Sequence, residues 1–436
     1  AFFREHAAAS GGYVYQLSAD LAKREGEGKV GRTTAWVQPP GTPSVGLAYL
    51  DAYRRCSDPM LLEAARETAD ALIRGQLYSG GWDHRIEFDP QDRRGYAYRV
   101  DGRDSKKLRN TTTFDDDKSQ SAMRFLMQLD RELEFQDPKI HESVLFALDA
   151  TTQAQYANGA WPQRSTELPD PTGVPKVRAS IPEQWSRTYP GTKYAGYYTL
   201  NDNTISDLIV TMLDAWEVYS DQRYLDAALR GGDFLLLAQL PEPQPGWAQQ
   251  YNESMQPAWA RKFEPPAITG SESQGAMRTL MLLYRRTAAE TENAGRFLDA
   301  LPRAIDYYRN SLLEDGRLAR FYELGTNRPL FFTKDYELTY SSDDMPTHYA
   351  FIVSSKIDAL ESELNRIRQT PRDQLWQAKR PPAAKRSKRL DQQVQRLIAE
   401  LDTRGAWVEP GRLRYHGDDD PTRQVIRSQT FITHLA

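Results

Sequence analysis

Apolar residues recur at helical spacing along most of the chain, from about residue 45 to residue 402. In the segment 45–55 they stand at Val45, Leu47, Ala48, Leu50 and Tyr53. Steps of three and four residues place such side chains on one face of an α-helix. The same pattern predicts further helices over residues 60–76, 118–133, 140–156, 203–219, 222–240, 271–287, 294–313, 349–368 and 389–402.

The predicted helices come in pairs, and each pair closes with a turn that joins a glycine to an aromatic residue. These turns are Gly81-Trp82, Gly159-Ala160-Trp161, Gly246-Trp247, Gly316 to Phe321, and Gly405-Ala406-Trp407. A unit that recurs every 70–90 residues or so is the signature of a repeat architecture. Short links make neighbouring helices antiparallel. The pattern therefore predicts an all-α fold, an (α/α) toroid of about five helix-hairpin repeats, with short Gly-Trp β-hairpins or loops on one rim.

The predicted repeats organise residues 1–436 as a single toroid domain. Residues 1–42 form an atypical N-terminal segment, as is common for terminal repeats. Residues 369–390 are a basic, proline-rich loop, and residues 403–436 are a C-terminal closing segment with a strand-like stretch at 412–415.

Composition and charge limit the classes of partner that the protein is expected to bind. The formal charge of -4 and the sequence pI near 6.0 offer no basic excess for a nucleic-acid backbone. The basic run 379–389 is predicted to be a solvated loop. No stretch approaches the roughly 20 apolar residues that span a membrane. Aromatic residues make up 11% of the chain, including 23 Tyr, and many lie beside glycine, which is typical of carbohydrate binding. Oligomeric state is undetermined.

Three consecutive carboxylates, Asp115, Asp116 and Asp117, follow three threonines and Phe114 directly before a predicted helix. One aspartate is explained by helix capping. Adjacent acids repel one another unless a cation or a basic group lies among them, so the cluster also predicts a hard-cation site. A second acidic helix start contains Asp202. In a toroid the two starts face one cleft, where Asp115 or Asp116 together with Asp202 could hold one cation.

Four ordered motifs resemble those of the family 10 polysaccharide lyases, the α-helical toroid pectate lyases. They are Thr-Thr-Phe-Asp-Asp-Asp at 112–117, Asn-Gly-Ala-Trp-Pro-Gln at 158–163, Thr-Leu-Asn-Asp at 199–202, and the segment 257–273 with Ala-Arg-Lys-Phe-Glu-Pro-Pro. The resemblance implies cleavage of an acidic polysaccharide, pectate by default, by calcium-assisted β-elimination. It implies that Asp115 and Asp202 are cation-binding and substrate-site acids, whereas Asp116 stands where the family has asparagine and adds negative charge. The predicted Ca²⁺ ligands are Asp115, Asp116 and Asp202. A start at Ala1 without methionine fits removal of an export signal, so a secreted or periplasmic location is expected.

The chain departs from the family at its catalytic base. Members of this family carry an arginine before a Gly-Tyr-aromatic segment, whereas this chain reads Met-Pro-Thr-His-Tyr-Ala-Phe over 345–351. His348 and Tyr349 are natural substitutes, and an imidazole titrates near neutral pH. A structural histidine at a helix cap is the alternative for His348. The predicted catalytic residues are His348, Tyr349, Arg261 and Lys262, with Lys334 and Arg320 as further candidates for the base.

Further residues are expected to contact the sugar. The predicted substrate-binding residues are Asp115, Asp116, Trp161, Arg164, Tyr198, Asn201, Tyr251 and Arg320. Trp161 has a structural alternative, since its tight turn also suits a ring that plugs the hairpin.

Two other functions remain open at this point. A glycoside hydrolase on a helical toroid would pair Asp115 or Asp116 with Asp202 or Glu272 across a glycosidic bond, without a metal. A non-catalytic glycan-binding relative would keep the cleft and lack the base.

Overall fold

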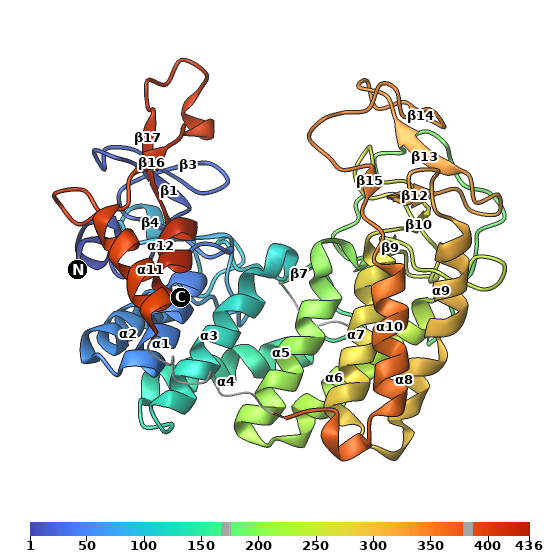
Figure 1. The fold of residues 1–436 in the computed structure, drawn as a ribbon, viewed down its shortest axis with the longest axis horizontal. Coiled ribbons are helices and arrows are strands. Elements are labelled where there is room, and N and C mark those ends of the chain that lie inside the picture. Colours follow the sequence, from blue (N-terminus) through green and yellow to red (C-terminus); the bar gives the residue numbers. More distant parts are fainter. Residues whose placement is uncertain (167–173, 175, 378–386) are drawn as a thin grey trace. The chain divides into compact units, whose positions relative to one another are not determined.

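The structure, a computed structural model, describes residues 1–166, 174, 176–377 and 387–436. The chain forms two compact units (Figure 1). The first unit consists of Ala1–Thr151 and Lys379–Ala436, drawn in blue, teal and red, and the second unit is Thr152–Ala378, drawn in green to orange. The two ends of the chain thus belong to the same unit. A single domain over 1–436 stays a prediction.

The first unit is built mainly from helices. They are the π-helix Phe3–Ala7, α1 (Thr42–Cys56), α2 (Pro59–Arg74), α3 (Lys118–Glu132), α4 (Pro138–Gln153, which crosses the boundary by two residues), α11 (Lys388–Ala399) and α12 (Ser428–Leu435). The start of α2 shows why this segment becomes a helix. Asp58 accepts a hydrogen bond from the Met60 amide at 2.9 Å, and Pro59 occupies the first turn, where its missing amide is not needed. Ala65, Ala69 and Leu72 then form a buried face.

A five-stranded antiparallel sheet joins the N-terminal and C-terminal segments of the first unit. Its order is β16 (Glu409–Pro410), β17 (Gln424–Arg427), β1 (Gln16–Ser18), β2 (Arg24–Glu25) and β3 (Lys29–Val30). Leu17 pairs with Ile426 in the central ladder. The strand predicted over 412–415 is wrong, because Arg414–His416 form a 3₁₀ turn held by Glu25, whose carboxylate accepts from the amides of Arg414 and Tyr415. The unit also contains β4 (Thr34–Trp36), β5 (Arg85–Glu87) and β6 (Thr112–Thr113).

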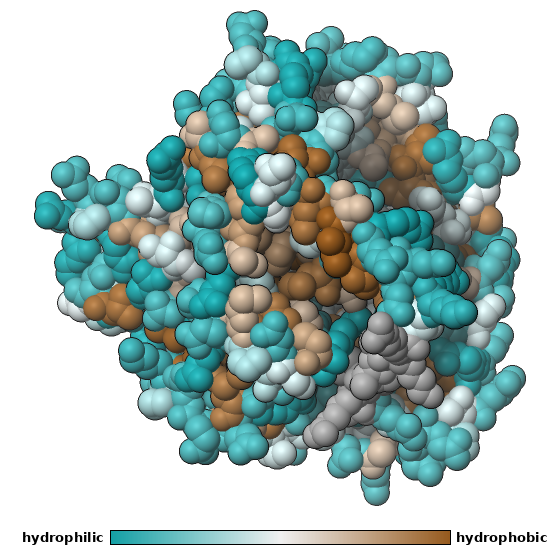
Figure 2. Space-filling view, turned by 60° about the vertical axis from the view of Figure 1, so that its left-hand side comes forward, coloured by the Kyte–Doolittle hydropathy of each residue, from teal (hydrophilic) through white to brown (hydrophobic). Residues whose placement is uncertain are grey.

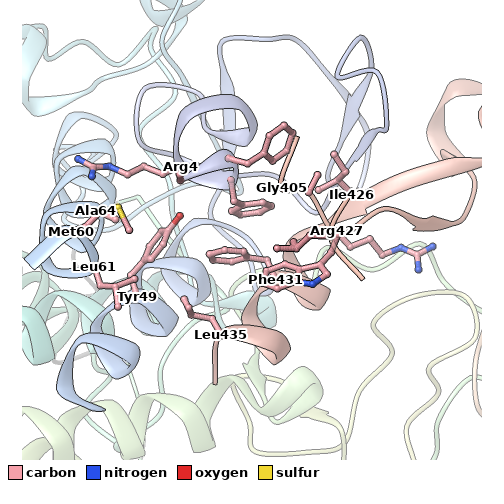
Figure 3. A pocket seen from close by; sticks show the side chains of 16 residues that line it. Arg4, Tyr49, Met60, Leu61, Ala64, Gly405, Ile426, Arg427, Phe431 and Leu435 are labelled. Atoms are coloured by element: carbon pink, nitrogen blue, oxygen red, sulfur yellow. The ribbon is translucent and has the colours of Figure 1, made fainter. Parts of the chain in front are cut away.

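The same two segments enclose an apolar cavity of about 230 Å³. Phe3 stacks on Phe431 with 4.0 Å between ring centroids, and Tyr49 and Trp407 complete the aromatic wall. Figure 3 shows Tyr49, Ile426 and Phe431 among the side chains that surround it. Burial of these rings ties the two ends of the chain to α1.

The second unit repeats the helix-pair pattern. Its helices are α5 (Thr204–Tyr219), α6 (Gln222–Ala238), α7 (Glu272–Thr287), α8 (Arg296–Asp299), α9 (Leu301–Asn310) and α10 (Ile357–Gln369). Helices α5, α7 and α10 each begin shortly after a two-residue strand. The strands are β7 (Arg164–Ser165), β8 (Tyr198–Thr199), β9 (Gln250–Tyr251), β10 (Ile268–Thr269), β11 (Leu318–Ala319), β12 (Phe321–Tyr322), β13 (Pro329–Phe332), β14 (Leu338–Thr339) and β15 (Ile352–Val353). Strands β10, β12, β13 and β14 form one sheet, and β8 pairs with β9 and β11 with β15.

The predicted (α/α) helix class is confirmed, with α1 packed on α2 and α5 on α6. One boundary is wrong: the helix expected to begin at Tyr349 begins at Ile357, because β15 occupies Ile352–Val353. The centre of the predicted loop 369–390, residues 378–386, lies outside the described residues, and α11 already begins at Lys388. Among the described helices, none combines the length and apolar character needed to cross a membrane. Hydrophilic residues predominate on the face in Figure 2, with smaller apolar patches between them.

The glycine-aromatic turns hold their tryptophans inside the protein. Trp82, Trp161 and Trp247 are each 0% exposed. The indole of Trp82 donates to the Leu72 carbonyl at 2.8 Å, and that of Trp247 donates to the Leu235 carbonyl at 2.7 Å. Trp82 and Trp247 therefore seal their hairpins against the preceding helices. The prediction that Trp161 binds substrate is wrong, because a fully buried ring has no free face for a sugar.

Replacing Trp161 by alanine is expected to lower the free energy of unfolding by about 3–5 kcal/mol, since a buried ring of this size leaves a cavity. Trp161→Phe is expected to cost less, because most of the ring volume is kept. Chemical denaturation of the three proteins measures both values. A Trp161→Ala protein with unchanged stability and impaired substrate binding would restore the role of sugar platform.

Candidate functional site

Two helix starts, one in each unit, adopt the same unusual backbone. Both follow a two-residue strand, and both place two consecutive non-glycine residues in the left-handed region: Asp116 (φ 51°) and Asp117 (φ 60°) before α3, and Asp202 (φ 49°) and Asn203 (φ 58°) before α5. Asp and Asn tolerate this conformation better than other residues with side chains. Such backbone tends to collect at functional sites. Asp116 and Asp202 hold the same position in the two turns.

In the first unit, the acids of the turn have basic partners that the sequence prediction lacked. Lys118 lies 3.0 Å from Asp116 Oδ2 and 3.9 Å from Asp115 Oδ2, and its side chain is buried. Arg124 contacts both carboxylate oxygens of Asp117, at 2.6 and 2.5 Å. Repulsion among the three acids is therefore partly offset by these two cations.

In the second unit, a tight turn presents Arg261. Glu264 accepts from Arg261 Nε at 2.8 Å and from Nη2 at 2.5 Å, and Gln249 donates to the same carboxylate at 2.5 Å. Glu264 is 1% exposed, whereas the Arg261 side chain is 42% exposed. Burial would raise the pKa of Glu264, but the Arg261 guanidinium holds it below its usual value. The buried glutamate thus fixes a guanidinium whose other side is open.

A second arginine, Arg320, lies beside the segment 345–351, in which the chain departs from the family it resembles. Its amide donates to the Phe351 carbonyl at 2.7 Å, and its guanidinium pairs with Glu272 at 2.6 Å. Both side chains are largely buried, at 13% and 4% exposed. Glu272 Oε2 and Arg320 Nε are buried with no hydrogen-bond partner among the described residues. This pair therefore keeps unused hydrogen-bonding capacity.

Tyr349 lies between the two arginines. The Arg320 guanidinium carbon is 4.4 Å from the centre of its ring, and that of Arg261 is 5.6 Å away. The hydroxyl donates to Glu264 Oε1 at 3.1 Å. Burial raises the pKa of Tyr349 well above its usual value, although both guanidiniums pull it down. Burial therefore favours the protonated phenol.

The charge of Asp202 acts on both arginines. Burial alone would lower the pKa values of Arg261 and Arg320, but their glutamate partners, Tyr349 and Asp202 raise both overall. The Asn201 amide donates to Asp202 Oδ2 at 2.6 Å, and the Asn201 backbone is bonded to the Gln249 carbonyl. Within the second unit, Asp202, Arg261, Arg320 and Tyr349 thus form one charged cluster.

Two further predicted residues lie at the edge of this cluster. His348 is exposed, and its ring meets Phe263 edge-on with 5.2 Å between centroids. Lys262 is also exposed, with its ammonium 3.5 Å from the centre of the Tyr336 ring. The helix-cap alternative for His348 is wrong, because α10 begins nine residues later, at Ile357.

Two of the predicted sugar-stacking rings are not available to a sugar. Tyr198 is 2% exposed and Tyr251 is 0% exposed. The Tyr251 hydroxyl donates to the Ala238 carbonyl at 2.6 Å and accepts from the Ala248 amide at 2.6 Å. Burial raises the pKa of Tyr198 to about 12. Both rings are structural, so this part of the prediction is wrong. Arg164, by contrast, is exposed in β7.

Glu264 and Lys118 were not among the predicted site residues. Glu264 stands three residues after Arg261 in the motif at 257–273. An arginine and a carboxylate at this spacing could have indicated their ion pair. Lys118 directly follows the three acids, at a position that looked like an ordinary first helical residue. The prediction that Asp202 shares one cation with Asp115 and Asp116 stays a prediction.

Comparison with known proteins gives a family match. A family model described as pectic acid lyase matches residues 76–349, a segment that contains both acidic turns, Arg261, Arg320 and Tyr349. A family 10 polysaccharide lyase from Cellvibrio cellulosa, solved in complex with trigalacturonic acid, has TM-score 0.49 at 19% identity over 75% of this chain and 98% of that chain. A sugar epimerase from a ruminal bacterium has TM-score 0.49 at 11% identity over 84% and 83%. Comparison with curated proteins finds no match.

Proposed function

The chain belongs to the pectic acid lyase family, and on this basis we propose that it cleaves a uronic-acid-containing polysaccharide, pectate by default, by β-elimination. The observation that carries the proposal is the pair of guanidiniums, Arg261 and Arg320, on either side of Tyr349. A proton beside a carboxylate becomes acidic only when the developing negative charge is neutralised. Two fixed cations supply that neutralisation.

The arginines are held for this task by buried acids. Glu264 orients Arg261 and Glu272 orients Arg320, so neither guanidinium has to reorganise when the substrate carboxylate gains charge. A guanidinium presents planar, paired donors that match a carboxylate. We assign Arg261 and Arg320 to the uronate carboxylate of the sugar that loses its proton.

Proton transfer falls to the exposed imidazole of His348 and the partly buried phenol of Tyr349. His348 takes the C5 proton, the electron pair forms the C4–C5 double bond, and the C4–O bond to the leaving sugar breaks. Tyr349, which stays protonated, gives its proton to the departing oxygen. Lys262, exposed beside Tyr336, contributes positive charge at the rim.

The donors at the two acidic turns fit calcium, which prefers carboxylate and amide oxygens. We propose Asp115 and Asp116 at the first turn and Asp202 at the second as the calcium-binding acids. Asn201 Oδ1, beside Asp202, is buried with no partner among the described residues, which leaves a hard oxygen donor free. Bound calcium would supply further positive charge for the substrate carboxylate. When no calcium is bound, Lys118 pairs with Asp116.

The test is incubation with a panel of uronans, including polygalacturonate, with calcium or with chelator. Elimination produces a 4,5-unsaturated uronate with ultraviolet absorbance, and we expect this absorbance to need calcium. Reducing ends without absorbance would establish hydrolysis instead. Binding without cleavage would identify a glycan-binding relative. The hydrolase hypothesis can use Glu272 as its second carboxylate. Glu272, however, already pairs with Arg320.

The pH dependence of kcat/KM distinguishes the two candidates for the base. With an imidazole as base, activity is expected to rise near neutral pH and then level off. A tyrosinate base at position 349 would shift this rise above about pH 10, because the pKa of Tyr349 is raised from that value.

The matched variants are His348→Ala and Tyr349→Phe. The first is expected to remove the rise near neutral pH, and the second is expected to lower kcat while keeping that rise. A profile in which His348→Ala behaves like the unaltered protein would exclude the histidine as base.

A further inference from the structure

A second cationic and aromatic group lies on the same end of the second unit as the arginine cluster. The segment 179–189 crosses this end and is fixed at several points: the Ala179 amide donates to the Leu237 carbonyl at 2.7 Å, and the Trp259 indole donates to the Ser186 carbonyl at 2.8 Å. None of the sequence predictions included this segment's side chains. They form an ordered surface of stacked rings and guanidiniums.

The stack alternates cations with rings. The Arg187 guanidinium lies 5.3 Å from the ring centres of both Trp185 and Tyr340, and the Arg328 guanidinium lies 3.4 Å from the Tyr340 ring. Tyr340 donates to Glu323 at 2.8 Å, and Glu323 also pairs with Arg187. Glu323 is buried, so it holds the Tyr340 hydroxyl and the Arg187 guanidinium from the protein side of the stack.

Arg328 has no acidic partner in this group. Its side chain is exposed, and no carboxylate among the described residues lies within ion-pair distance of it. Arg187 has one carboxylate partner, and its side chain is still 47% exposed. Two guanidiniums against one buried glutamate leave a net positive charge that faces solvent. Such a site suits a carboxylate, which a guanidinium binds with two parallel hydrogen bonds.

Aromatic contacts connect this group to the arginine cluster. Ring centroids are 5.3 Å apart for Tyr349 and Phe351, 5.8 Å for Phe351 and Phe332, 6.2 Å for Phe332 and Trp259, and 6.5 Å for Trp259 and Trp185. Along the chain, Arg320 and Glu323 are three positions apart in an extended segment, which is about 10 Å. The two groups are therefore spaced like separate sugars of one polymer and not like one binding pocket.

We propose that Arg328 and Arg187, with the Trp185 ring, form a distal subsite for a second uronate residue of the same acidic polysaccharide chain. The guanidiniums bind its carboxylate, and the half-buried indole stacks on its ring face. This subsite rests on the proposed uronan substrate and adds chain-length preference to it. An oligosaccharide long enough to reach both groups binds more tightly than one that fills the arginine cluster alone.

The test compares tri- and hexagalacturonate with Arg328→Ala and Trp185→Ala. For the hexamer, KM is expected to rise about tenfold in each variant, because one charge-assisted or stacking contact is lost. For the trimer, kcat/KM is expected to stay within about twofold of the unaltered protein. Arg223→Ala is the matched control, since Arg223 is an exposed arginine of this unit at the start of α6. Arg328→Lys should recover part of the hexamer affinity.

Calorimetric titration of both oligomers into the same proteins, with calcium present, separates the subsite from the reaction. If the protein cleaves no uronan but Arg328→Ala weakens hexamer binding and leaves trimer binding unchanged, the proposed reaction fails and the subsite stands. If Arg328→Ala and Trp185→Ala match Arg223→Ala for both lengths, the subsite is refuted while the lyase reaction is untouched.

Discussion

Replacing Arg320 by alanine is expected to reduce kcat/KM on polygalacturonate by about 10²–10³-fold, the usual effect of removing one fixed donor from a developing anion. The reason is its position: the guanidinium is held by Glu272 at 2.6 Å and lies against Tyr349, so it meets the substrate carboxylate already oriented. Steady-state rates of formation of the unsaturated product give the measurement.

The alanine variant also leaves Glu272 buried without its partner, which costs about 3–5 kcal/mol of stability. A double variant, Arg320→Gln with Glu272→Gln, removes both charges and keeps amide hydrogen bonding. It should fold well and remain inactive. Arg320→Lys should be intermediate, since it retains the charge and loses the planar fork. An active, well-folded double variant would show that Arg320 does not touch the reacting sugar.

Replacing Asp202 is expected to weaken calcium binding at least about 100-fold and to abolish calcium-dependent cleavage. Asp202 stands at a left-handed position of its turn, with φ of 49°, so the choice of variant matters. Asp202→Gly keeps this backbone without the carboxylate, because glycine adopts it freely. Asp202→Asn keeps an oxygen ligand and loses the charge, and is expected to bind calcium with intermediate affinity.

Calorimetric titration with calcium alone measures the effect independently of activity. Asp226→Ala is the control, since Asp226 is an exposed acid on α6 whose carboxylate accepts from Gln222. Unchanged calcium affinity in both Asp202→Gly and Asp202→Asn would remove Asp202 from the metal site.

Hydrophobic spacing was sufficient to predict the helices, because one buried face of each helix must repeat every three to four residues. It failed at residues 349–356, where the apolar residues Phe351, Ile352 and Val353 belong to a short strand and the turn before it. A run this short fits helix and strand equally well without knowledge of its pairing partner. The partner is β11, which lies more than 30 residues earlier in the chain.

The charged residues of the site were predicted better than its aromatic residues. Arg261, Arg320, Asp202 and Tyr349 gather in the second unit. Arg261 and Asp202 had been named from family motifs, Tyr349 from the segment that departs from the family, and Arg320 as a substrate-binding residue and further candidate for the base. Tyr198 and Tyr251 were predicted to contact the sugar. Strands β8 and β9 turn both rings inward, and that direction depends on strand register, which a sequence does not specify.

Mass spectrometry of the products of one defined oligogalacturonide, incubated with the protein and calcium, tests the elimination reaction most directly. Elimination adds no water, so the account predicts two fragments whose masses sum to that of the substrate, one of them carrying the unsaturated sugar. Fragments whose masses sum to the substrate plus one water would contradict it, because they would show that the glycosidic bond is hydrolysed.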